Sequence, residues 1–122
     1  MPIKTAKVEK HLKEVEKKLQ SLVQEVNMQI QTLNNSISSK VLYINSISGK
    51  IEALEENYSD LGFTTKEKDE KVETYKHNIE HGSQEVQNLQ QQVEDVRNKA
   101  VAESQRLQGK MELYRELLDL SD

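Results

Sequence analysis

Apolar residues recur every seven positions between residues 30 and 117 without a change of phase. A stripe with this 3.5-residue period lies on one face of an α-helix and must be covered by another helix. The pattern therefore predicts an all-α fold, a long coiled-coil helix that packs against a partner helix. The predicted interface residues are Ile30, Leu33, Ile37, Ile44, Ile47, Ile51, Leu54, Tyr58, Leu61, Val72, Tyr75, Ile79, Val86, Leu89, Val93, Val96, Leu107, Tyr114 and Leu117.

The N-terminal part follows the same period in a different phase. The step from Val26 to Ile30 is four residues where three is due, which indicates a stutter that unwinds the supercoil locally without ending the helix. Residues 19–49 contain only two charged side chains, Glu25 and Lys40, and Ser, Asn and Gln supply most of their polar surface. Because Ser and Asn are mediocre helix formers, we expect a weakly stable solvated helix here or, alternatively, a hinge or docking surface.

The best candidate for an interruption lies at about 61–66. Gly62 suits a left-handed C-cap, and Thr64 with Glu67 matches the capping-box pattern of a helix start. The heptad phase nevertheless passes through this stretch intact, so we favour a continuous or kinked helix over an antiparallel hairpin. The predicted segments are 1–61, which contains the stutter near 26–30, the candidate break at 62–66, and 67–122.

Defects in the apolar stripe bear on the choice of partner. Four stripe positions carry charge, at Lys40, Lys68, Glu103 and Lys110, and Gly82 is expected to leave a hole. In a parallel homodimer each charge would face its own copy, which is costly unless the side chain reaches solvent. We therefore expect heteromeric pairing with other coiled-coil chains, and the alternative is a homodimer with lysines that reach into solvent.

The last turns carry a wider apolar face than a two-stranded seam needs. Either more than two helices meet there or the helix end docks onto a globular surface, and we favour docking over a plain hydrophobic cluster at a helix end. The residues of this predicted docking surface are Met111, Leu113, Leu118 and Leu120.

Composition narrows the function classes. Only 34% of the 122 residues are hydrophobic, which is less than a compact domain with an enzymatic pocket usually contains. The absence of Cys excludes disulfides and thiolate metal sites, and the net charge of −4 gives no reason to expect nucleic-acid binding. Because the sequence contains neither a membrane-spanning apolar run nor a secretory signal, we expect an intracellular protein, cytoplasmic or nuclear.

One short motif suggests metal chemistry. Residues 77–81 fit the pattern His-x-x-Glu-His, and His77 and His81 share a helix face as zinc ligands do. Both histidines and Glu80, however, occupy solvent-facing heptad positions, and no third ligand is evident. We therefore expect no catalytic residues, no metal and no cofactor, and a protein that is not an enzyme.

The C-terminal sequence is more specific than a heptad repeat requires. The runs Asn98-Lys99-Ala100, Ala102-Glu103, Arg106-Leu107-Gln108 and Leu113-Tyr114-Arg115 are followed by Leu117 and Leu120. These roughly 25 residues resemble the coiled coil that precedes the globular head of one kinetochore protein. That protein is the smaller centromere-proximal subunit of the four-subunit outer-kinetochore complex that attaches microtubules. The resemblance implies a long parallel heterodimer that transmits spindle force to the centromere.

The sequence thus predicts a structural protein that binds partner helices. Our first specific expectation is a scaffold or assembly subunit of a kinetochore complex. The alternatives are a membrane-traffic tether or SNARE-like bundle helix, and a cytoskeletal or ciliary scaffold.

Overall fold

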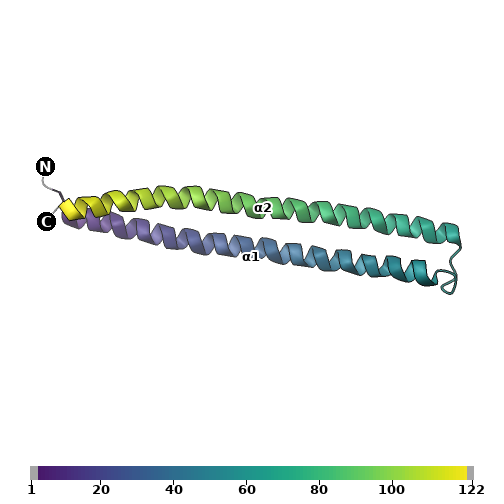
Figure 1. The fold of residues 1–122 in the computed structure, drawn as a ribbon. Coiled ribbons are helices and arrows are strands. Elements are labelled where there is room, and N and C mark those ends of the chain that lie inside the picture. The colour runs from purple at the N-terminus through teal and green to yellow at the C-terminus, as the bar shows by residue number, and fades with distance from the viewer. Residues whose placement is uncertain (1–2, 121–122) are drawn as a thin grey trace. The chain divides into compact units, whose positions relative to one another are not determined.

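The computed structural model describes residues 3–120, and within them the fold is all-α. Helix α1 spans Thr5–Asn57 and helix α2 spans Thr65–Leu120, with no strand among the described residues. The only proline of the chain is residue 2, so neither helix contains one. A turn joins the two helices at residues 58–64 (Figure 1), so the expectation of a continuous helix is wrong and the alternative of a turn is confirmed.

The C-terminus of α1 is closed by a Schellman motif centred on Gly62. The Phe63 N–H donates to the Tyr58 carbonyl at 2.9 Å, and the Gly62 N–H donates to the Ser59 carbonyl at 3.1 Å. These two bonds satisfy carbonyls that would otherwise be left unpaired at the helix end. Gly62 has a φ of 88°, a left-handed conformation that glycine adopts without the steric cost of a Cβ atom.

The N-terminus of α2 is closed by the predicted capping box. The Glu67 N–H donates to Thr64 Oγ1, and the Thr64 N–H donates to Glu67 Oε1, both at 3.2 Å. This backbone donor is the main reason why the pKa of Glu67 lies below its ordinary value. A C-cap motif and an N-cap motif therefore lie directly next to each other. Together they interrupt the helix, although the heptad phase continues through this stretch.

Contacts divide the chain into two compact units, each made of one segment of α1 and one segment of α2. Within the described residues, unit 1 joins 3–31 with 94–120. Its core consists of Val15, Leu107 and Met111. The rings of His11 and Tyr114 stack with centroids 6.0 Å apart, so the start of α1 lies beside the end of α2 and the two segments are antiparallel. The residues packed around this core are Leu12, Leu19, Leu22 and Tyr114.

Unit 2 comprises residues 32–93 and contains the turn. Its buried hydrophobic residues are Ile47, Leu54, Val72 and Val93. The segments are again antiparallel, since the Lys68 amine lies 5.2 Å from the Tyr58 ring and the Lys50 amine lies 5.9 Å from the Tyr75 ring.

Gly82 does not leave the expected hole in this seam. The residue is buried, and a Cβ atom built on it would lie 3.1 Å from Ile44 Cγ1. The space that a side chain at position 82 would occupy is therefore already filled by Ile44 from the opposite helix. The expectation failed because it considered position 82 without the residue that faces it.

Candidate protein interface

The chain itself covers nearly all of the interface residues that the heptads predict. Ile47, Leu54, Val72, Val93 and Leu107 are buried. Leu61, which lies in the turn, is the exception and is exposed. The remaining predicted residues are partly buried, namely Ile30, Leu33, Ile37, Ile44, Ile51, Tyr58, Tyr75, Ile79, Val86, Leu89, Val96, Tyr114 and Leu117. Their contact with a second chain stays a prediction.

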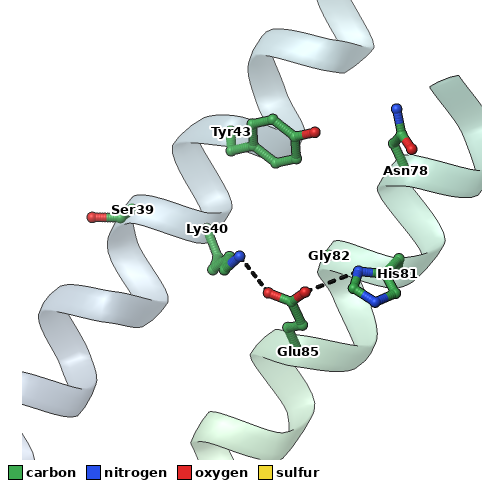
Figure 2. Close-up of a pocket in the computed structure, with 7 residues that line it drawn as sticks. All are labelled: Ser39, Lys40, Tyr43, Asn78, His81, Gly82 and Glu85. Atoms are coloured by element: carbon green, nitrogen blue, oxygen red, sulfur yellow. Dashed lines mark ion pairs between the residues drawn. The ribbon is translucent and has the colours of Figure 1, made fainter.

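The charged stripe position Lys40 is paired across the two helices of unit 2. Figure 2 shows its amine directed at the Glu85 carboxylate, which also forms an ion pair with His81, with Oε1 2.9 Å from Nδ1. The hydrogen bond from Lys40 is the main reason why the pKa of Glu85 is lowered. Gly82 lies between His81 and Glu85 in sequence and lines the same open pocket, together with Tyr43.

Two of the other charged stripe positions also have partners within the chain. Lys68 Nζ lies 2.7 Å from Asp69 Oδ1, and this contact raises the pKa of Lys68. Glu103 accepts a hydrogen bond of 3.0 Å from Arg106 Nε and a second one from the same guanidinium, which lowers its pKa. Lys110 is exposed to solvent. These charges therefore do not require a second chain, although they were the reason to expect a heteromeric one.

The histidine motif lies on an exposed face, as its heptad positions predict. His77 Nε2 is 3.6 Å from Glu73 Oε1, and its Nδ1 is 4.0 Å from Glu80 Oε2. His81 pairs with Glu85 instead, so the two rings face different carboxylates of their own helix. Among the described residues, no group of three or more His, Cys, Asp or Glu side chains could hold a metal ion.

The residues of the predicted C-terminal docking surface differ in their exposure to solvent. Met111 is only 8% exposed and belongs to the core of unit 1, so it is not available to a partner and its assignment to this surface is wrong. Leu118 is partly buried, whereas Leu113 and Leu120 are exposed. The apolar face is wide because it combines Met111, which packs against α1, with Leu113 and Leu120, which are exposed to solvent.

Other exposed apolar side chains were missed because they lie outside the heptad stripe. In unit 2, Val41, Leu42 and Tyr43 follow one another on α1, and Leu42 is 70% exposed. In unit 1, Val23 and Val101 are 51% and 56% exposed. The signal that pointed to the residues on α1 is the low charge of the stretch 19–49.

These features define an all-α protein built of antiparallel helix pairs with apolar side chains left on their outer surfaces. A scan of family models and searches of curated proteins and of solved structures find no match to the chain. Within residues 3–120, neither helix has a stretch that is both long and apolar enough to cross a membrane.

Proposed function

We propose that this chain is a non-enzymatic assembly module that binds helices of other chains. The observation that carries the proposal is the exposed run Val41, Leu42 and Tyr43 in unit 2. Single exposed apolar residues are common on protein surfaces. Consecutive helix positions lie about 100° apart, so these three side chains together leave much of the outer side of α1 apolar. Full burial of one leucine side chain contributes about 2 kcal/mol, so a stable contact has to extend from Leu42 to neighbouring side chains.

The surroundings of Leu42 favour a helix as the partner. The residues three and four positions away on the same face are Ser38, Ser39, Asn45 and Ser46, all of them exposed. Residues with this spacing are neighbours on a helix surface, so Leu42 stands among small, uncharged side chains. Small side chains permit the close approach of a second helix axis, at about 8–10 Å, and no long charged side chain obstructs the contact.

The cellular setting of the proposal rests on the resemblance of residues 98–120 to a kinetochore coiled coil. It suggests a heteromeric coiled-coil partner from the outer kinetochore, in the cytoplasm or nucleus. Within unit 1 the same segment already packs against α1 through Leu107 and Met111. A kinetochore partner would therefore bind outside the seam, at surfaces such as Leu42 or the C-terminal Leu113 and Leu120.

Site-specific photocrosslinking in the cells that make the protein tests the proposal. A photoreactive amino acid is placed at position 42, and the matched control carries it at Glu56, which is exposed two heptads further along α1. We expect one specific protein to be crosslinked from position 42 and not from position 56. Ser46→Arg, which places a long cation beside the probe, should remove that product.

The possible outcomes separate the two parts of the proposal. Equal labelling from positions 42 and 56 refutes a helix-binding surface at Leu42. A specific partner that has no role at the kinetochore refutes the proposed setting and leaves the assembly function in place.

A further inference from the structure

We propose that one side of unit 1, centred on Val23 and Val101, binds the same side of a second copy of this chain. This contact is separate from the Leu42 surface and does not depend on it. The two valines come from different helices, and both line a single shallow groove along the helix pair. Each is more than half exposed, so the groove leaves aliphatic surface in contact with water.

Two grooves along unit 1 differ sharply in the charge of their lining residues. The groove of Val23 and Val101 is completed by aliphatic residues and by neutral polar residues such as Asn27 and Gln105, and none of its lining residues is charged. The second groove is lined by charged residues from both helices. These are Lys17, Lys18, Glu25 and Glu103.

The chemistry of the uncharged groove suits its own copy. In a two-fold contact every surface group meets the same patch of the partner, so a charged patch would bring like charges together. The groove of Val23 and Val101 has no charged lining residues, so a two-fold contact there brings no like charges together. Its amides Asn27 and Gln105 each offer both a donor and an acceptor, so they can form hydrogen bonds with their own copies, as lysines or carboxylates cannot.

The available area is sufficient for a contact that extends beyond the uncharged groove along the whole side of unit 1. Unit 1 contains about 27 residues of each helix, which corresponds to a length of about 40 Å at 1.5 Å per residue. Two helices packed 8–10 Å apart present a face about 20 Å wide, so the whole side of the pair offers about 800 Å². The uncharged groove, with residues 22–27 and 100–108, covers about a third of that length. Stable interfaces bury about 800 Å² on each partner. Two copies joined on this side would form a four-helix arrangement. In residues 3–31 and 94–120, the core of a single unit has three buried residues, Val15, Leu107 and Met111.

Sedimentation equilibrium on the full chain tests the dimer. At micromolar concentrations we expect twice the 14.1 kDa mass of one chain. Val101→Glu should raise the dissociation constant about tenfold or more, because it buries a carboxylate without a partner. Ala53→Glu, which adds a carboxylate at an exposed apolar residue of unit 2 outside the Leu42 surface, should leave the mass unchanged. A wild-type monomer, or a dimer that is equally sensitive to both variants, overturns the proposal.

Crosslinking locates the contact without disturbing the fold. The chain has no Cys, so Val101→Cys introduces the only thiol. We expect a short bis-maleimide reagent to join two Val101→Cys chains and to leave Ala53→Cys chains single. Crosslinking of Ala53→Cys alone would place the contact elsewhere and overturn the proposal.

Discussion

Gly82→Ala tests whether the seam of unit 2 is as tightly closed as the structure indicates. The added methyl group would lie 3.1 Å from Ile44 Cγ1 and 3.3 Å from Ile44 Cδ1, where ordinary contact begins at 3.4 Å. Either Ile44 or the helix backbone must therefore shift by a few tenths of an ångström. Because Ile44 is only partly buried, we expect its side chain to yield first.

Two opposing effects set the magnitude. Alanine is favoured over glycine in a helix interior by about 0.5–1 kcal/mol. Overpacking costs typically 1–3 kcal/mol, and the partial exposure of Ile44 places this site at the lower end. We therefore expect Gly82→Ala to destabilise the fold by about 0.5 kcal/mol. Gly109→Ala, in the same helix with nothing within 4 Å, should stabilise it by about 0.5–1 kcal/mol.

Urea unfolding followed by circular dichroism, at one fixed protein concentration, measures both variants. In an Ile44→Ala background the obstructing atoms are absent, so Gly82→Ala should regain the stabilisation seen at Gly109. The reasoning is refuted if Gly82→Ala stabilises the wild-type chain as much as Gly109→Ala does. It is also refuted if the Ile44→Ala background leaves the effect of Gly82→Ala unchanged.

Three further predictions concern the turn and the effect of pH. Thr64→Ala should lower the unfolding free energy by about 1 kcal/mol through loss of the N-cap, and an unchanged urea midpoint would contradict this. Gly62→Ala should cost about 1–2 kcal/mol by forcing a side chain into the left-handed region, again measured in urea. The folded-state pKa values of Glu67, Glu85 and Glu103 lie below 4.5, so their stabilisation should be complete above pH 4.5 and be lost on further acidification. A Tm that does not fall between pH 5 and pH 3 would contradict the last prediction.

The helix ends were predictable because their chemistry is local. Gly62, Thr64 and Glu67 lie within six consecutive residues, and each acts on backbone groups of its neighbours. The unbroken heptad phase favoured a continuous helix because a loop was expected to shift the phase. In an antiparallel pair each helix presents its own stripe to the other, so the phase in α2 is set by packing and is independent of the turn.

The identity of the covering helix was not predictable from periodicity. A stripe of period 3.5 shows that a helix must be covered, but any helix with a matching stripe can cover it. Lys40 and Glu85 illustrate this, since their pairing depends on the antiparallel alignment that the turn creates across unit 2. When each helix is considered alone, Lys40 is a charge in the seam without a partner. Gly82 then leaves a hole, because the facing Ile44 is not taken into account.

The outer face of α1 connects the low charge of residues 19–49 with the proposed contact at Leu42. A helix face that stays in water gains stability from Lys, Glu and Gln, which are good helix formers, and the stretch around Leu42 contains Ser and Asn instead. Such a face costs helix stability while it is solvated. It becomes favourable when another helix covers it, because small side chains then permit close packing around a leucine. The composition of residues 19–49 and the exposure of Leu42 are therefore the two observations that support the proposed contact with another chain.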